Sequence, residues 1–283
     1  MDADTGRLDF PPEILSHYGD GREQERLRRG RNRLELARTQ QILQRFLPAP
    51  PAQILDIGGG PGEYAAWLAR SGYDVHLLDA TPLHVEQARE TARRQPSHPF
   101  AADMGDARSL PFSTASADAV LLLGPLYHLT EREDRVRALQ EALRVLRPEG
   151  LLAAAAISRF APLFDGLQFH FLDDPDFVRI VERDLREGQH RNPSNHPHYF
   201  TTAFFHHPDE LAGEVIEAGF EIEAVLLVEG PGLFVPDLDV WWHDQERRER
   251  LLQFIAAVER EPSLLGLGGH LLALARPPGD HHE

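Results

Sequence analysis

The chain of 283 residues contains no cysteine and no lysine. The absence of cysteine excludes disulfide bonds, thiolate metal sites and a cysteine nucleophile. Long apolar runs are also missing, since none approaches the roughly 18 residues that a membrane-spanning helix needs. The N-terminal sequence MDADTGRLDF has no signal-peptide pattern. We therefore expect a cytoplasmic protein without a membrane partner.

Positive charge is scarce in this chain. Arginine supplies all 29 basic residues against 45 acidic ones, which gives a formal net charge of −16. Nucleic-acid binding requires clustered cations that neutralise phosphates, so a nucleic-acid partner is not expected. The contents of 42% hydrophobic and 26% charged residues are ordinary for a globular protein. No internal repeat or independent second domain is visible, so residues 1–283 are expected to form a single domain.

Residues 53–62, QILDIGGGPG, form the most informative stretch. Ile54, Leu55 and Ile57 make an apolar run typical of a buried strand, and four glycines follow within the next five residues. Glycine has no Cβ, so it adopts positive φ and lets a ligand approach the backbone. Residues 63–70 are expected to form a helix whose N-terminus offers N–H groups. The pattern predicts a site for a nucleotide-like ligand with a carboxylate; a tight turn without a ligand is the alternative.

The glycine spacing bears on the class of cofactor. The strict dinucleotide fingerprint G-x-G-x-x-G fails when it is counted from Gly58 or from Gly59. Counted from Gly60, only the relaxed form that ends in Ala65 fits, so a dinucleotide-dependent oxidoreductase stays open as an alternative. By contrast, the pattern D-x-G-x-G-x-G is complete from Asp56 onward.

Strands and helices alternate regularly within residues 48–157, the expected cofactor-binding core. After the first strand and helix, the expected strands are 73–78, 98–102, 120–123 and 151–157, and the expected helices between them include 82–94 and 130–147. This alternation is typical of a parallel, doubly wound α/β sheet. Residues 208–228 and 263–276 are expected to add two late strands and to complete the core.

Asp79 ends the second expected strand, roughly 20 positions beyond the glycine turn, where an acidic residue can accept hydrogen bonds from both hydroxyls of a ribose. A carboxylate at the end of a strand is otherwise often a helix N-cap. Thr81 and Pro82 already supply that signal for the following helix. The sequence therefore favours the ribose role for Asp79.

Three segments lie outside the core pattern. Residues 1–47 are expected to form an N-terminal helical extension, because apolar residues near its end fall on one helical face. Residues 158–207 and 229–262 interrupt the alternation and are expected to be insertions that cap the active site, with a plain surface loop as the alternative for the first. Histidine is abundant in 158–207, but the spacings match no metal-binding motif, so no metal is expected.

The glycine pattern that starts at Asp56, the acid at Asp79 and the G-D-A segment at residues 105–107 together resemble the class I S-adenosylmethionine-dependent methyltransferases. The closest similarity in style is to the bacterial ubiquinone/menaquinone-biosynthesis type. The resemblance implies a seven-stranded, Rossmann-like α/β sheet, mostly parallel with an antiparallel last strand. It implies S-adenosylmethionine as cofactor, S-adenosylhomocysteine as product and a small-molecule acceptor. The implied cofactor-binding residues are Tyr18, Arg38, Asp56, Gly58, Gly60, Asp79, Ala80, Asp106, Ala107 and Leu123.

The resemblance also implies individual roles. In the family a G-D-A segment holds the adenine, so the Asp106 carboxylate would accept from the exocyclic amine and the Ala107 backbone would meet a ring nitrogen. Asp103 competes for the role of Asp106. Many members use an N-terminal extension as a lid, so Arg38 would pair with the methionine carboxylate while Tyr18 covers the site. The alternative for this extension is a solvated charged face with one packed tyrosine.

Acceptor chemistry is expected beyond the fourth strand, because ligands of open α/β sheets bind at the carboxyl ends of strands. Tyr127 and His128 are the expected catalytic residues there, and His198 from the first cap is a third. A neutral histidine suits removal of a proton from a phenol, carboxylate or amine, whereas an acceptor that arrives deprotonated needs no base. The alternative is that Tyr127 packs beneath the next helix and that His128 faces solvent.

The function predicted from the sequence is methyl transfer to a small molecule by in-line displacement, in which the protein mainly aligns the reactants and excludes water. A non-catalytic S-adenosylmethionine-binding regulator is the alternative from another class, because cofactor motifs can persist without turnover. Assembly as a homodimer is left open, and the acceptor itself is not predicted.

Overall fold

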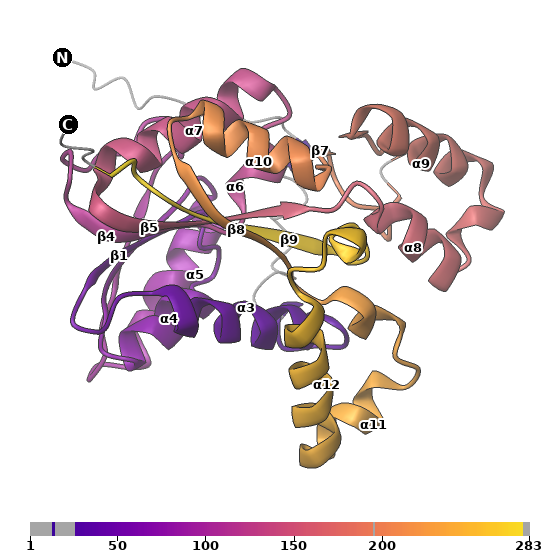
Figure 1. The fold of residues 1–283 in the computed structure, drawn as a ribbon, viewed down its shortest axis with the longest axis horizontal. Helices are drawn as coiled ribbons and strands as arrows, with labels where there is room; N and C mark the ends of the chain where they lie inside the picture. Colours follow the sequence, from indigo (N-terminus) through magenta and orange to yellow (C-terminus); the bar gives the residue numbers. More distant parts are fainter. Residues whose placement is uncertain (1–12, 15–25, 195, 280–283) are drawn as a thin grey trace.

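The computed structural model describes residues 13–14, 26–194 and 196–279 (Figure 1). Its core is one seven-stranded sheet with the order β3-β2-β1-β4-β5-β9-β8. In chain order the strands are β1 (Gln53–Ile57), β2 (Asp74–Asp79), β3 (Ala101–Met104), β4 (Ala117–Leu122), β5 (Leu146–Ile157), β8 (Glu221–Leu227) and β9 (His270–Arg276). The expected α/β fold with a seven-stranded sheet is therefore confirmed.

Strand direction also follows the expectation. The neighbouring pairs from β3 to β5 are parallel, whereas β9 runs antiparallel to both β5 and β8. Because β9 is reversed, it begins at the edge where the parallel strands end. Its first residue, His270, pairs with Ile157, the last residue of β5. This carboxyl edge of the sheet is where the functional residues gather.

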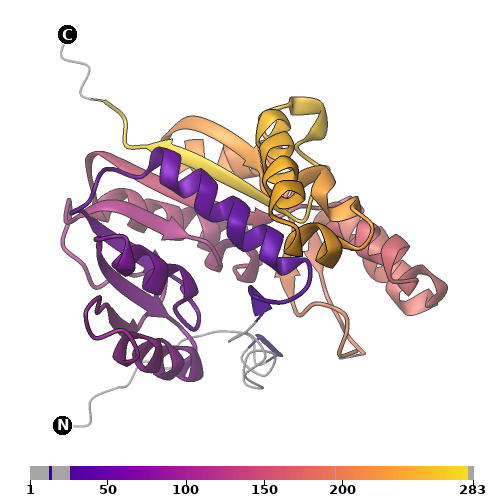
Figure 2. The same ribbon diagram turned by 90° about the horizontal axis from the view of Figure 1, so that it is seen from below.

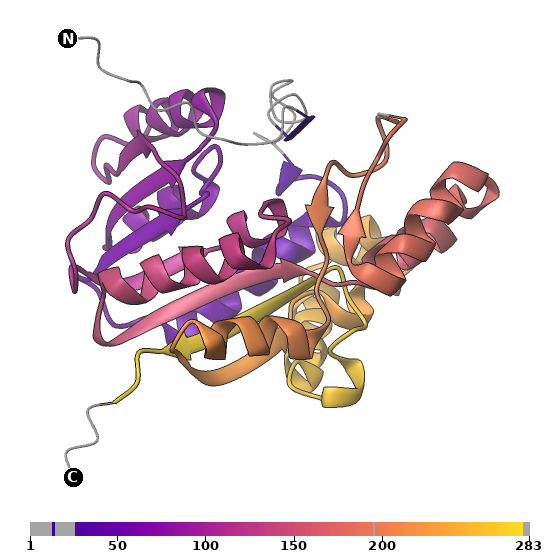
Figure 3. The ribbon, with the colours of Figure 1, turned by 90° about the horizontal axis from the view of Figure 1, so that it is seen from above.

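Helices cover both faces of the sheet. On one face lie α3 (Asn32–Phe46), α4 (Glu63–Arg70) and α5 (Pro82–Arg93), and on the other lie α7 (Arg132–Val145) and α10 (Pro208–Glu217). Figure 2 shows α3 crossing the first face, and Figure 3 shows α7 and α10 across the second. Within β4, Leu121 packs against the helices of the first face and Leu122 against those of the second. A strand buried on both faces needs a continuous apolar run, as β4 has.

Two insertions follow β5 and β8 and supply the caps (Figures 1 and 3). The first contains α8 (Ala161–Gln168), η1 (Phe171–Asp173), α9 (Pro175–Glu187), β6 (Gln189–His190) and β7 (Ala203–Phe204). The second contains η2 (Gly230–Phe234), α11 (Leu238–His243), α12 (Gln245–Val258) and η3 (Pro262–Leu264). The described helices include none with both the length and the apolar character to cross a membrane.

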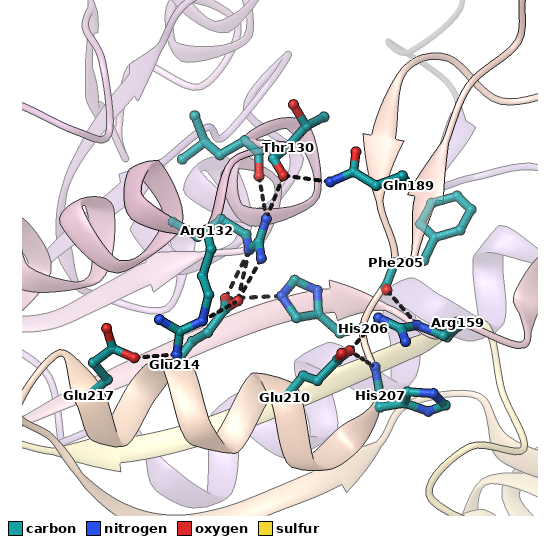
Figure 4. Close-up of polar contacts among 12 residues, drawn as sticks. Thr130, Arg132, Arg159, Gln189, Phe205, His206, His207, Glu210, Glu214 and Glu217 are labelled. Atoms are coloured by element: carbon teal, nitrogen blue, oxygen red, sulfur yellow. Dashed lines mark hydrogen bonds and ion pairs between the residues drawn. The ribbon is translucent and has the colours of Figure 1, made fainter. Parts of the chain in front are cut away.

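A buried ion cluster ties the first cap to the core. Glu214 on α10 takes a bidentate ion pair from Arg135 on α7, with 2.6 Å between Nη2 and Oε1. Figure 4 shows its other partner, His206, whose Nε2 lies 3.1 Å from Oε2. The Arg135 guanidinium also covers the ring of Phe204 in β7. Burial opposes ionisation of Glu214, but His206 and Arg135 outweigh it and lower its pKa to about 2.

We expect Glu214→Gln to reduce the free energy of unfolding by about 3–5 kcal/mol at pH 7, because it leaves the buried Arg135 without its carboxylate. Glu217→Gln on the same helix is the matched control, since its pair with Arg132 is exposed; its effect should stay within about 0.5 kcal/mol. Urea unfolding of both variants measures this. The contribution of Glu214 should be complete above its ordinary pKa of 4.5 and disappear as the pH falls toward about 2. Equal stability of the two variants at pH 7 would contradict the role given to Glu214.

Candidate functional site

A two-lobed pocket lies at the carboxyl edge of the sheet. The first lobe is a cavity of about 100 Å³ and the second a cavity of about 70 Å³. Both are lined by Gly58, Gly60, Gly124 and Tyr127, so they adjoin along the glycine turn. The first lobe extends over the ends of β2 and β3, and the second extends toward α3 and the start of β9.

The glycine turn has the geometry that the sequence predicts. Gly58 and Gly60 have φ values of +71° and +55°, where side chains with a Cβ are strained. A Cβ on Gly58 would come within 2.7 Å of Pro125, so glycine is also needed there for close packing. A Cβ on Gly60 would meet no atom within 4 Å. The backbone at Gly60 therefore faces open space, where a ligand can approach it.

Asp79, at the end of β2, lines the first lobe and is held in place by the turn. Its Oδ2 accepts the Gly60 N–H at 2.9 Å, and its Oδ1 accepts the Thr81 N–H at 2.8 Å. Nδ1 of His84 lies 3.2 Å from the same Oδ1. An ionised carboxylate offers about four acceptor positions. Asp79 therefore stabilises the local backbone and keeps capacity to accept from a ligand, whereas Thr81 is the N-cap of α5.

Asp56 is the most unusual carboxylate of the pocket. It is fully buried, lines the second lobe, and neither of its oxygens has a hydrogen-bond partner of normal geometry among the described residues. Burial, and then the negative charge of Asp79, raise the pKa of Asp56 to about 7, although the backbone of Ala65 partly opposes this rise. A buried carboxylate without such a partner is costly unless a ligand satisfies it. The second lobe is therefore suited to a ligand with a cationic or hydrogen-bond-donating group.

The G-D-A segment is only partly at the pocket. Gly105 and Ala107 line the first lobe. The carboxylate of Asp106 instead receives the guanidinium of Arg108, with 2.7 Å between Oδ2 and Nη2. A contact of Asp106 with adenine therefore stays a prediction. The competing Asp103 is exposed and pairs with residues on the outer surface, His76 and Arg89, so the geometry does not favour it.

The predicted role of Arg38 is wrong. Its side chain is fully buried between α3 and the end of α12, where Nη2 lies 2.6 Å from Glu259 and Nε donates to the Val228 carbonyl. The physical reason is its helical position, one turn from both Leu34 and Ile42 on the buried face of α3. Arg38 lines neither lobe.

The other predicted residues are distributed over different places. Tyr127 lines both lobes from the short helix α6 (Pro125–His128), His128 and Ala80 line the first lobe, and Leu123 lines the second. Tyr127 is largely buried and its hydroxyl lies 3.4 Å from the Leu123 carbonyl, so it packs as the alternative expects, and its catalytic role stays a prediction. His198 is exposed and lies at a separate cavity. Tyr18 lies outside the described residues.

That separate cavity, which we call the cap cavity, has a volume of about 270 Å³. It is lined by six aromatic residues of the first cap: Phe164, Phe171, Phe177, Tyr199, Phe200 and Phe205. It shares Arg26 and His270 with the second lobe. The two sites therefore adjoin at these two side chains.

A charged cluster at this boundary was not predicted from the sequence. Arg26 pairs with Glu35 of α3 at 2.7 Å, and Nδ1 of His270 lies 2.5 Å from Oε1 of Glu229. Burial lowers the pKa of His270, but Glu229 and Glu35 outweigh it and raise it to about 9. The sequence does hold a signal for His270. A residue that begins an antiparallel strand must lie at the edge where the neighbouring parallel strands end.

Glu35, Glu229 and His270 have the residue types of a metal site, and their ligand atoms lie within 4.8 Å of one another. The surrounding charges disfavour that use. Glu35 already receives Arg26, and Glu229 binds both Nδ1 and the backbone N–H of His270. A metal would have to displace the Arg26 guanidinium from Glu35 and a proton from the His270 ring. The cluster is therefore a set of ion pairs.

Comparison with known proteins identifies the central part of the chain. Residues 54–150 match the family described as a methyltransferase domain. Methyltransferase GfsG of Streptomyces halstedii is 34% identical over 121 residues, which cover 42% of this chain and 42% of that protein. The demethylmenaquinone methyltransferase of Beutenbergia cavernae is 38% identical over 109 residues, which cover 38% of this chain and 42% of that protein. The chain thus spans less than half the length of either relative.

Solved structures agree on the fold. A SAM-dependent methyltransferase from Methanosarcina mazei superposes with a TM-score of 0.57 at 20% identity, and the alignment covers 84% of this chain and 98% of that one. At this identity the likeness shows the fold alone. The chain therefore has the fold of solved S-adenosylmethionine-dependent methyltransferases, and its residues 54–150, which carry the glycine turn and Asp79 at the carboxyl edge of the sheet, match a methyltransferase domain.

Proposed function

We propose that the protein transfers a methyl group from S-adenosylmethionine to a small-molecule acceptor. The observation that carries the proposal is the two-lobed pocket on the glycine turn, which adjoins a separate cavity beneath the caps. The name of one relative, a demethylmenaquinone methyltransferase, supports a small-molecule acceptor. On the basis of the composition alone, the proposal includes no nucleic-acid partner and a location in the cytoplasm.

The pocket suits the parts of the cofactor in a definite order. The first lobe would take the adenosine, with Asp79 accepting from the ribose hydroxyls and the backbone of Gly105 and Ala107 beside the adenine. The second lobe would take the amino-acid part, with Asp56 facing its ammonium group. Arg26 lines this lobe and replaces Arg38 as the arginine for the carboxylate. Bound S-adenosylmethionine supplies an activated methyl group on a sulfonium, so the protein's task is alignment.

Tyr127 would separate the cofactor from the acceptor. It lies at the junction of the lobes, packs its ring against Phe200 at the cap cavity and is held by α6. A buried aromatic ring at this junction limits the access of water to the reacting groups, which favours displacement over side reactions. This role needs no proton transfer by Tyr127 or by His128.

Methyl transfer itself is the direct test of the proposal. We expect the purified chain to transfer isotopically labelled methyl groups from S-adenosylmethionine to at least one member of a pooled set of small metabolites. Mass spectrometry of the labelled products would identify the acceptor. Binding of S-adenosylmethionine without transfer to any member would favour the regulatory alternative, and absence of binding would reject the proposal.

Asp79→Asn should weaken binding of S-adenosylhomocysteine by about ten- to a hundredfold, because hydrogen bonds to a charged group are the stronger kind. Calorimetry measures the affinity. Asp103→Asn is the matched control. Asp103 lies on the neighbouring strand, β3, and its carboxylate pairs with His76 and Arg89 on the outer surface. If both variants bind like the wild type, the ribose role of Asp79 is lost.

Asp56→Asn should have opposite effects on stability and binding. The raised pKa of Asp56 means that the wild type without cofactor loses stability as the pH rises from the ordinary value of 3.8 toward about 7. The amide removes that loss, so the melting temperature at pH 8 should rise. Affinity for S-adenosylhomocysteine should fall, because its ammonium group loses a carboxylate.

Asp118→Asn is the control for this substitution. Asp118 lies at the opposite edge of the sheet, where it accepts the Gln53 N–H and pairs with Arg147. Its replacement should leave the affinity for S-adenosylhomocysteine unchanged. An Asp56→Asn variant that binds S-adenosylhomocysteine as tightly as the wild type would remove Asp56 from the cofactor site.

A further inference from the structure

We infer that the cap cavity is the acceptor site and that it takes a flat, largely apolar molecule with one anionic oxygen, which the imidazole Nε2 of His270 binds. This inference rests on the proposed function, because it places the acceptor beside the cofactor lobes. The anionic oxygen is a phenolate, an enolate or a carboxylate, which share the chemistry that the cavity offers.

The walls of the cavity are suited to a flat apolar body. Phe171, Phe177 and Tyr199 form a mutual cluster with ring centroids between 4.5 and 5.3 Å apart. Phe200 and Phe205 line the side nearer to the sheet, with centroids 6.1 Å apart. Aromatic rings arranged in this way favour planar partners through stacked and edge-on contacts. The size and shape of the acceptor are therefore determined by residues outside the cofactor core.

His270 lies at the inner end of these walls and is oriented by Glu229. The Glu229 carboxylate binds it twice, since Oε1 lies 2.5 Å from Nδ1 and Oε2 accepts the backbone N–H at 2.9 Å. Glu229 follows β8 and His270 begins β9, so two adjacent strands fix their relative position. Nε2 has no hydrogen bond to a residue in the described parts of the chain. The ring thus presents its second nitrogen at the boundary of the cap cavity and the second lobe.

The charges around His270 keep it protonated. Glu229 approaches from the end of β8 and Glu35 from α3, and both favour the imidazolium. Arg26, the partner of Glu35, opposes them more weakly. Asp165 of α8 lines the same cavity and also interacts electrostatically with His270. With a pKa of about 9, His270 carries its proton at neutral pH and donates from both ring nitrogens.

The other cations that line the cap cavity use more than one nitrogen on their neighbours. Arg26 donates from both Nη1 and Nη2 to Glu35, and Arg31 donates to Asp165 of α8 and to Gln168. The ring of His190 lies against Asp184 through Nδ1 and against the Phe200 carbonyl through Nε2, and His198 is exposed. His270 uses only Nδ1 on Glu229, so among the described arginines and histidines of this cavity its Nε2 is the best placed for a new anion.

The protonated state of His270 suits an acceptor that arrives as an anion. A protonated His270 cannot remove a proton from the acceptor, but it stabilises the form that has already lost one. The sulfonium of bound cofactor would carry a positive charge near the same boundary and would favour an anion further. His270 is therefore a binding residue for the acceptor and not a general base.

Binding of three matched coumarins tests the inference. Coumarin has the flat body alone, 7-hydroxycoumarin adds a phenol, and coumarin-3-carboxylate adds a carboxylate. In the presence of S-adenosylhomocysteine, the wild type should bind one or both of the acidic compounds more tightly than coumarin. Bound 7-hydroxycoumarin should also show a larger phenolate fraction in its excitation spectrum than the free compound at the same pH. The two acidic compounds distinguish a phenolate site from a carboxylate site.

His270→Gln should weaken binding of the preferred acidic coumarin by about ten- to a hundredfold, the range of a hydrogen bond to a charged group. It should leave coumarin unaffected and abolish the shift toward phenolate. In the wild type, affinity for the preferred compound should fall as the pH rises through about 9, where His270 loses its proton. Thermal melting checks that the variant is folded, and His243→Gln, at an exposed histidine of α11, is the matched control.

Equal affinities of wild type and His270→Gln for the acidic compounds would overturn the inference, as would a preference for coumarin or no binding of any of the three. Failure of the proposed function is recognised separately. If S-adenosylhomocysteine does not bind the wild type in calorimetry, methyl transfer is rejected. The coumarins can then still be measured without it, and the same comparison decides whether the cap cavity binds anions through His270.

Discussion

The direction of the strands is the constraint on which the site depends. Parallel strands bring their carboxyl ends to one edge, so the residues that follow β1, β2, β3 and β4 meet there although they are far apart in the chain. The reversed strand β9 adds to the same edge by its first residue, His270, which pairs with the end of β5. A fully parallel sheet would have placed that residue at the opposite edge. Because of this reversal, His270 lines both the second lobe and the cap cavity.

The local geometry that the sequence predicts, and that the structure has, is encoded by consecutive segments. The positive φ values of Gly58 and Gly60 and the position of Asp79 follow from a strand, a glycine turn and a helix that are consecutive in the chain. The alternating apolar segments likewise predict the sheet, because a doubly covered strand must be apolar on both faces. Short-range patterns of this kind need no knowledge of distant partners.

The incorrect part depends on distant partners. Arg38 pairs with Glu259, which lies 221 positions away, so no local pattern reports that its charge is already compensated. Its spacing from Leu34 on a buried helical face was the available warning. The charged cluster at His270 was missed for a similar reason, because the position of His270 follows from how β9 is inserted between β5 and β8. The expected antiparallel last strand was the available signal. The predicted catalytic role of His198 stays a prediction.

The boundary cluster couples the two halves of the proposed site through charge. Arg26, Glu35, His270 and Glu229 alternate in sign, and Arg26 and His270 each line both the second lobe and the cap cavity. If Arg26 turned to a bound carboxylate, Glu35 would lose its partner and would favour the imidazolium of His270 more strongly. Loading of the second lobe would then strengthen the cap cavity's preference for an anion. The coupling would be reciprocal, so an anion in the cap cavity would equally strengthen binding in the second lobe, and it requires no movement of the backbone.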